Sequence, residues 1–325
     1  MDRLRINRHS AVAGTAIWIL WQFLAGPSTP AVLMALSPLV LVPLLLGPLL
    51  DAAPGSLDDS KLLRGLSFAQ LPCALPLTFA TSLSPGGLAM LAALPWAAWT
   101  AVAAVEGTRR VVARLRAHGP RDLLLGRGAG ELAIAGGLGF PIVGSLWLIA
   151  HTLGLQPLGF SKLIVILTAA HFHHAGFTLP IMAGYLVRTE PESRVWRVTA
   201  AALVLAVPLV AIGITASPLL EVASSWLTAG CGLAVGVGML RRARELPTLP
   251  AMLSALAGAS LFAAMTFAGS YAVSEFLGTP VPDIRTMVEV HGAVNALGFG
   301  LLGAWSWKLT GLGQPAPEAE DTDAD

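Results

Sequence analysis

A succession of apolar segments, each long enough to cross a lipid bilayer, constrains the fold of this chain more than any other feature. A membrane-spanning helix needs about 20 mostly apolar residues, because the hydrocarbon core is about 30 Å thick. The sequence offers about ten such segments, at 11–26, 31–50, 62–82, 86–105, 130–153, 161–187, 197–217, 221–240, 250–277 and 286–309. We therefore expect an all-α, polytopic transmembrane helix bundle of about ten spans.

The composition leaves room for little besides a membrane domain. Hydrophobic residues make up 55% of the chain and charged residues 12%, about half the charged share of a soluble domain. We expect one transmembrane domain over residues 1–312 and a disordered, acidic cytoplasmic tail over 313–325. This excludes a soluble catalytic domain and argues against nucleic acid as a partner, whereas membrane lipids are expected to surround the protein.

Positive charges predict the orientation, because cytoplasmic loops of membrane proteins are enriched in Lys and Arg. Basic residues gather before the first segment and after every second one, at 61–64, 109–127, 188–197 and 241–244. The intervening connections contain few of them. Both termini are therefore expected in the cytoplasm. The first segment follows three arginines, as a signal peptide would, but further apolar segments follow, so we interpret it as a membrane helix.

Prolines are expected to kink two of the spans. The second segment contains Pro38, Pro43 and Pro48, and the third contains Pro72 and Pro76. A proline inside a helix removes a backbone hydrogen bond and clashes with the preceding turn. We interpret these prolines as a matter of helix packing.

Three histidines lie in the middle of the sixth apolar segment, where a polar ring is costly unless it is paired, hydrated or bound to something. On a regular helix His171 and His174 lie about 60° apart, whereas His173 points to the opposite side from His171. The tenth segment contains His291 and, one turn deeper, Asn295. Both segments run inward from the outer face. We therefore expect His171, His174 and His291 to converge in the outer half of the bundle.

Further polar residues are expected near the same outer half. Glu289, in the first turns of the tenth segment, is the candidate catalytic acid or base, unless the positive end of the helix merely stabilises it. His151 ends the fifth segment and Glu275 lies near the outer end of the ninth. With His173 and Asn295, they are expected to support the ligands or to contact a substrate. The alternatives are helix-bridging hydrogen bonds for His151 and Asn295, and an interfacial position for Glu275.

The inner half of the membrane contains few polar residues in the sequence. Glu106 ends the fourth segment and Glu131 lies near the start of the fifth. This asymmetry predicts one cavity that opens outward.

Two motifs together resemble the YndJ-like family of bacterial membrane proteins: His171-Phe-His-His-Ala-Gly-Phe177 and His291-Gly-Ala-Val-Asn-Ala-Leu-Gly-Phe299. The family pattern is His-Phe-His-x-Ala-Gly-Phe followed by His-Gly-x-x-Asn-Ala-x-Gly-Phe, within a multi-span architecture that extends here to about Lys308. The resemblance implies a multi-pass protein of the bacterial inner membrane, sometimes labelled a transporter. It supplies no catalytic residues.

A shorter likeness covers only His171-Phe-His173, which is similar to the His-Phe-His element of haem–copper oxidase catalytic subunits. In that family, opposite faces of one helix ligate two haems. The sequence departs from the pattern, because His174 stands where the family usually has Tyr and His291 comes later in the chain rather than earlier. No separate copper-binding His pair is present on another segment. The likeness points to haem or metal only locally.

Three hypotheses about function follow, in order of preference. The first is a site for a transition metal (Zn, Cu or Fe) or haem, ligated by His171, His174 and His291. If catalytic, it would be a redox or metal-dependent enzyme acting on a lipophilic substrate, with Glu289 as acid or base. The second is a small-solute or proton-coupled transporter that uses the same residues. It is weakened by the absence of a recognisable inverted repeat and of ionisable groups on the cytoplasmic side. The third is a structural membrane protein with helix-bridging histidines.

Overall fold

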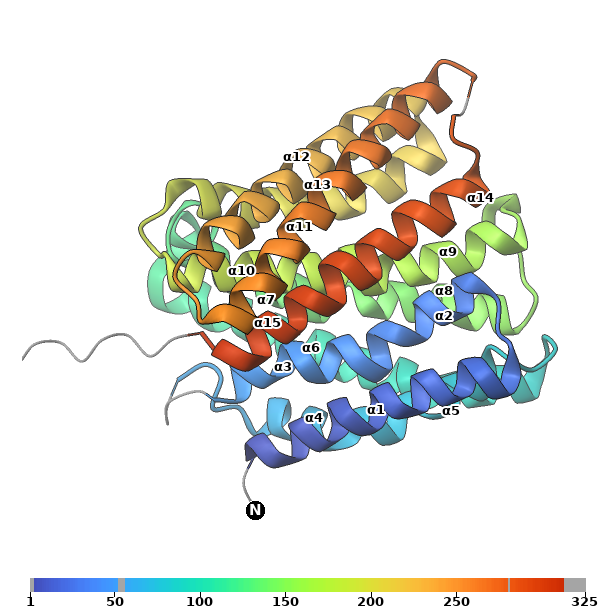
Figure 1. The fold of residues 1–325 in the computed structure, drawn as a ribbon, viewed down its shortest axis with the longest axis horizontal. Helices are drawn as coiled ribbons and strands as arrows, with labels where there is room; N and C mark the ends of the chain where they lie inside the picture. Colours follow the sequence, from blue (N-terminus) through green and yellow to red (C-terminus); the bar gives the residue numbers. More distant parts are fainter. Residues whose placement is uncertain (1–2, 52–55, 280, 313–325) are drawn as a thin grey trace, which may run out of the picture.

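The computed structural model describes residues 3–51, 56–279 and 281–312, and the side chains from residue 9 onward. Within these ranges every regular element is a helix and no strand occurs. The helices run roughly alongside one another, and their connections gather at two opposite ends (Figure 1). The expected all-α helix bundle is confirmed. The predicted acidic tail lies outside the described residues.

In the part of the chain that the structure describes, ten helical rods cross the bundle, several of them built from consecutive elements. In chain order they are α1 (Arg3–Ala25); α2 (Thr29–Leu36), η1 (Ser37–Leu41) and α3 (Val42–Leu50); α4 (Lys61–Ala74) and α5 (Pro76–Ala80); α6 (Gly87–Leu125); α7 (Gly128–Gly139) and α8 (Pro141–Thr152); α9 (Lys162–His173), η3 (His174–Thr178) and α10 (Leu179–Thr189); α11 (Arg194–Ala216); α12 (Pro218–Ala243); α13 (Thr248–Phe276); and α14 (Ile284–Thr286), η4 (Met287–Gly292), η5 (Val294–Leu301) and α15 (Leu302–Thr310).

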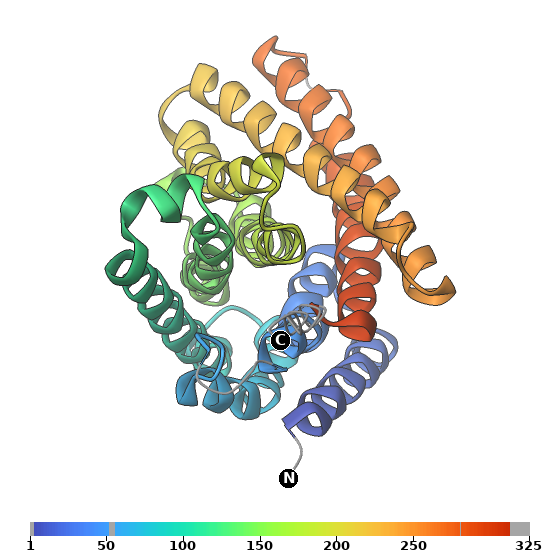
Figure 2. The ribbon, with the colours of Figure 1, turned by 90° about the vertical axis from the view of Figure 1, so that its left-hand side faces the viewer.

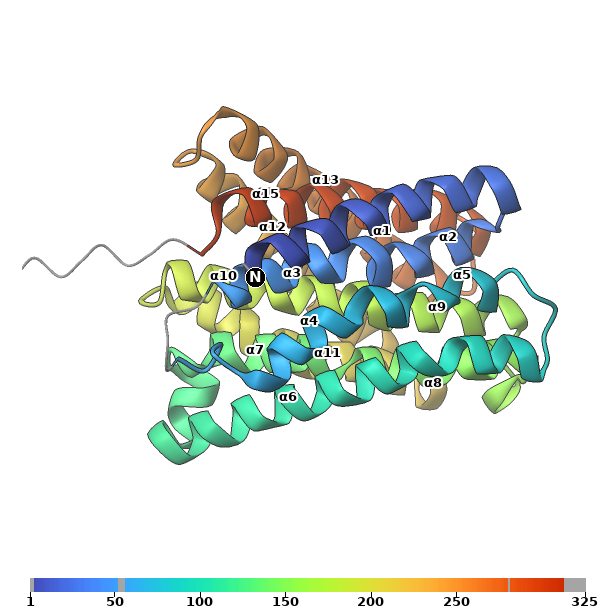
Figure 3. The ribbon, with the colours of Figure 1, turned by 90° about the horizontal axis from the view of Figure 1, so that it is seen from below.

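Among the described residues, eight of these rods are long and apolar enough to span a membrane. The other two are α1, whose apolar part covers His9–Ala25, and the α4–α5 pair. The rods match the ten predicted segments. Because α1 begins and α15 ends at the same end of the bundle (Figures 1 and 3), the charge pattern predicts that this end faces the cytoplasm. We call it the inner end and the opposite one the outer end.

Helix α6 is much longer than the fourth predicted segment, which ends at residue 105. It continues to Leu125, with a break at Gly119, whose φ is +77°. Glycine adopts this left-handed conformation without steric cost, and Pro120 directly after it cannot continue the backbone hydrogen bonding. The extension carries most of the basic residues of this connection beyond the apolar part of the helix.

The second rod, α2–η1–α3, lies at the centre of the bundle. In the most apolar stretch of 18 residues within this rod, 94% of the residues are buried inside the protein. Figures 1 and 2 place α1 at one edge of the bundle and α12 and α13 at the opposite edge. Helix α1 packs against η1 at Gly14, where a Cβ atom would lie 1.9 Å from the carbonyl oxygen of Leu39. Only glycine permits so close an approach of the two backbones.

The prolines of this central rod interrupt its backbone hydrogen bonding; the kinks expected in this rod and the next stay predictions. Pro38 lies in the π-helical segment η1, in which the Val42 N–H donates to Ser37 O. In that register the next donor is residue 43, a proline with no N–H, so the carbonyl of Pro38 lacks a backbone partner. The buried side chain of Gln70 supplies the hydrogen bond instead. Tyr185, also buried, donates to Leu45 O further along the rod. Gln70, from another span, therefore satisfies the carbonyl that a proline frees, and Tyr185 adds a second side-chain bond to the rod.

π-Helical geometry recurs in two further rods, the sixth (η3) and the tenth (η4 and η5). The three interrupted rods contact one another, since η5 touches both η1 and η3, and η4 touches α2. Single π-helical segments inside α-helices occur frequently at functional sites. The two sequence motifs, 171–177 and 291–299, overlap these segments.

Candidate functional site

The histidines singled out in the sequence lie where the three interrupted rods meet. His171 and His173 end α9, His174 begins η3, and His291 lies in η4. His171 interacts electrostatically with both His174 and His291, so imidazoles from the sixth and tenth rods are neighbours. His171 is nine residues from the start of α9, about 14 Å at 1.5 Å per residue. His171 thus lies within electrostatic range of His174 and His291, in the outer half of the bundle; the convergence of the three on one ligand stays a prediction.

His171 has an exposed side chain, although Phe172 and His173 beside it are buried. His174, His291 and Asn295 are partly exposed. We call the residues His171, His174, His291 and Asn295 the outer pocket, after the outward-opening cavity that the sequence predicts; that cavity stays a prediction, and the cavities described below lie elsewhere.

Hydrogen bonds fix two of these imidazoles to neighbouring rods. His174 Nε2 donates to Leu33 O of α2, at 2.8 Å. The Leu33 side chain also lies against η4, because a Cβ atom at Gly292 would be 3.0 Å from Leu33 Cδ1. Leu33 therefore connects the two histidine-bearing rods through the central one.

His291 is held from both sides. Its Nδ1 donates to Ala264 O of α13, at 2.9 Å. Its Nε2 accepts a hydrogen bond of 3.4 Å from the amide of Asn295, one turn further along the same rod. Asn295 thus orients His291, and the tautomer with the proton on Nδ1 satisfies both contacts.

His173 belongs to the helix packing and not to the outer pocket. It is fully buried. The Trp96 indole N–H donates to its Nε2 at 2.8 Å, and its Nδ1 donates to Ala169 O at 2.8 Å. Trp96 in turn stacks on Trp99 with ring centroids 4.6 Å apart. Both ring nitrogens are satisfied, so this imidazole joins α9 to α6 and does not face a ligand.

The residues do not fit the expected metal centre. Across the described part of the chain, no three or more His, Cys, Asp or Glu side chains form a group that could hold a metal ion. A histidine ligates through a free ring nitrogen. In His291 both nitrogens are already in hydrogen bonds, and in His174 one is. We therefore derive no chemical step through a metal or haem.

The remaining predicted residues lie around the outer end. Glu289 is exposed in η4. Glu275, at the end of α13, accepts a hydrogen bond from Tyr271 at 3.3 Å and interacts with Glu221. His151 is half-buried near the end of α8 and interacts with Lys162. Within the described residues, no hydrogen bond or ion pair joins Glu289, Glu275 or His151 to the outer pocket.

Sequence reasoning missed a buried ionic network at the inner ends of the helices. It joins Asp58, before α4, to Glu106 and Arg110 of α6, Glu131 of α7 and Arg188 of α10. Glu106 and Arg110 are 0% exposed. Their positions at the ends of apolar segments were the signal in the sequence. In the sequence, Glu106 stands only as one of the few polar residues of the inner half, and Arg110 only as one of the basic residues that mark a cytoplasmic connection.

Arg110 and Arg188 both contact more than one carboxylate. Arg110 Nη1 lies 2.5 Å from Asp58 Oδ1 and 3.5 Å from Glu131 Oε2, while its Nε donates to Glu106 at 3.0 Å. Arg188 donates to Asp58 and to Glu131, each at 2.6 Å. Burial alone would raise the pKa of Asp58, but Arg188 and Arg110 outweigh it and hold that pKa below its usual range. Asp58 is therefore charged at neutral pH.

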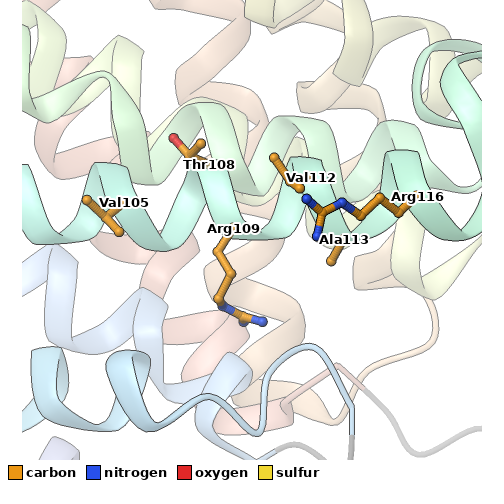
Figure 4. Close-up of a pocket in the computed structure, with 6 residues that line it drawn as sticks. All are labelled: Val105, Thr108, Arg109, Val112, Ala113 and Arg116. Atoms are coloured by element: carbon orange, nitrogen blue, oxygen red, sulfur yellow. The ribbon is translucent and has the colours of Figure 1, made fainter.

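A cavity of about 530 Å³ opens beside this network at the inner end, and Glu131 and Arg188 form part of its wall. A second cavity, of about 440 Å³, lies on the surface of α6 between Val105 and Arg116 (Figure 4). All six of its lining residues belong to that one helix. We therefore carry only the first cavity further.

Comparison with known proteins assigns the chain to a family. The YndJ-like protein family matches residues 32–299, a range that contains both motifs. The uncharacterized membrane protein YndJ of Bacillus subtilis (strain 168) is 30% identical over 182 residues, which cover 55% of this chain and 33% of the relative. The similarity thus spans about a third of that relative's length, and no solved structure matches. The chain is a member of the YndJ-like family of membrane proteins.

Proposed function

We propose that this protein is a small-solute transporter of the bacterial inner membrane and that the outer pocket binds its solute. The observation that carries the proposal is the meeting of three interrupted rods, in which His174 bonds to the central rod and His291 lies on the η4 segment that touches it. Transporters bind substrates near the bilayer midplane at discontinuous helices. Irregular backbone is tolerated at this depth only where it is buried in protein or lines a water-filled cavity.

The outer pocket has the chemistry of a polar binding site. The imidazole of His171 is exposed, and Asn295 and His174 are partly exposed beside it. An imidazole and an amide can each donate and accept hydrogen bonds. These groups suit a small polar solute better than an apolar one.

The inner ionic network supports the second hypothesis over the first and third. The sequence offered few ionisable groups on the cytoplasmic side of a transport path, which counted against a transporter. The network places Asp58, Glu131 and Arg188 there, beside an open cavity. A purely structural role for the histidines accounts for His173, but not for the exposed His171.

Solute flux into proteoliposomes tests the proposal. We expect at least one class in a panel of amino acids, sugars, carboxylates and nucleosides to enter faster than into protein-free liposomes under an imposed pH gradient. His171→Asn should reduce that initial rate at least tenfold, because it removes the exposed imidazole. His9→Asn, at an exposed histidine of α1, should leave the rate unchanged.

Protein that elutes as a single species and retains its helical circular dichroism, yet admits no solute of the panel, contradicts the proposal. Flux that His171→Asn leaves intact contradicts the assignment of the outer pocket as the binding site.

A further inference from the structure

We infer that Asp58 is the latch of an inner gate, which closes the cytoplasmic side of the transport path through its bonds to Arg110 and Arg188. The inference rests on the proposed function, since it assigns the second barrier that alternating access requires. Its test measures the accessibility of a cysteine rather than solute flux, so the gate and the proposed transport function can each fail without the other.

Asp58 lies on the connection before α4, whereas the residues that it contacts lie on long helices. Its carboxylate bonds Arg110 of α6 and Arg188 of α10, at 2.5 and 2.6 Å. Two further bonds attach the same connection to α6. Arg109 donates to Leu57 O at 2.7 Å, and Ser60 donates to Glu106 at 3.0 Å. Polar contacts therefore hold residues 57–60 against the helices.

The helices on the other side of these contacts form a tightly packed unit. A Cβ atom at Gly107 of α6 would lie 2.5 Å from Ala135 O of α7. A Cβ atom at Gly184 of α10 would lie 2.7 Å from Gly130 O of α7. Backbones this close cannot slide past one another without separating. The contacts of Asp58 thus join a connecting segment to a rigid unit of helices. A gate can open where this segment separates from that unit.

The space on either side of the network fits a closed gate. The 530 Å³ cavity reaches Glu131 and Arg188 from the inner end, so cytoplasmic water already touches the network. On the opposite side, Met182 and Tyr185 of α10 are 0% exposed. His174 and Arg188 are 14 residues apart, about 21 Å along the rod. Between the outer pocket and the cavity the path is therefore blocked by packed side chains and by the ion pairs.

The charges of the network explain why it would hold one closed geometry. Three carboxylates, Asp58, Glu106 and Glu131, face the guanidinium groups of Arg109, Arg110 and Arg188. Desolvation offsets much of the attraction within buried ion pairs, so the pairs add little net stability. Removal of one partner is nevertheless costly, because it leaves the other charge buried and unpaired. Loss of the Asp58 charge leaves Arg110 and Arg188 one acceptor short. Hydration of these groups from the cavity is then favoured.

Labelling of a cysteine behind the gate tests the inference. Cys73 and Cys231 are free cysteines, so both are replaced by Ala, and Met182→Cys is introduced as the reporter. A membrane-impermeant thiol reagent is added to inside-out vesicles. We expect Met182→Cys to be protected in this background and to react at least tenfold faster when Asp58→Asn is added. Asp59→Asn is the matched control, because Asp59 is next to Asp58 in the chain but its carboxylate pairs with Arg64 instead.

Unchanged protection of Met182→Cys in folded Asp58→Asn protein overturns the inference. The inference is also overturned if Met182→Cys in the Asp58→Asn protein reacts as fast from the outer side as from the inner side and the melting temperature falls. That pattern indicates a general loosening of the protein. Arg188→Lys provides a second variant that keeps the charge but loses the forked geometry of the guanidinium. It should give an intermediate rate from the inner side. If Asp58→Asn does not fold, no acceleration in Arg188→Lys contradicts the latch.

Discussion

Replacement of Arg110 with methionine is expected to lower the free energy of unfolding by about 3–5 kcal/mol, because it breaks a buried ionic network by removing one partner. Arg110 is 0% exposed and contacts Asp58, Glu106 and Glu131. Methionine fills most of its volume but leaves these carboxylates without their central cation. Unfolding in mild detergent, followed by circular dichroism, measures the loss.

Arg127→Met serves as the matched control. Arg127 pairs with Glu192 at the surface, and the two side chains are 64% and 72% exposed. Exposed ion pairs contribute at most about 1 kcal/mol. Equal losses in the two variants would show that the network is not buried in the membrane protein.

Gly14→Ala is expected to lower the free energy of unfolding by about 1–3 kcal/mol or more, as overpacking does in a well-packed interior. The added Cβ atom would lie 1.9 Å from Leu39 O, an atom of the backbone that cannot rotate away as a side chain can. Helix α1 must then move off the central rod. The thermal midpoint of the purified protein measures this effect.

Gly230→Ala provides the opposite expectation in the same kind of element. Gly230 lies within α12, and nothing would lie within 4 Å of its Cβ atom. Alanine in a helix interior is favoured over glycine by about 0.5–1 kcal/mol. A loss of stability in Gly230→Ala as large as that in Gly14→Ala would contradict the close packing of α1 on η1.

The fold followed from the sequence because the bilayer sets the length of each apolar segment. All ten segments correspond to helical rods, including the first, which could have been mistaken for a signal peptide. Helix α6 was the clearest departure. Hydropathy marks where the apolar part ends, near residue 105, but not that the basic extension to Leu125 remains helical.

The candidate site was predictable only in part. The depth of His171 and His291 follows from orientation and helical rise, and the structure brings these two residues together. The sequence does not predict the π-helical segments. In the structure, the α-helix α9 ends at His173 and the π-helical segment η3 begins at His174. The ionic network could not be predicted, because hydropathy does not show whether Asp58 or Arg188 meets water or a partner from another helix.

Accessibility of residue 171 from the outer side tests most directly whether the outer pocket exists. In the background without Cys73 and Cys231, His171→Cys should react with an impermeant thiol reagent added outside intact cells. Phe172→Cys, at a buried neighbour, should react at least tenfold more slowly. If His171→Cys is as inert as Phe172→Cys, or reacts only from the cytoplasmic side, the pocket does not open outward and the proposed transport path is wrong.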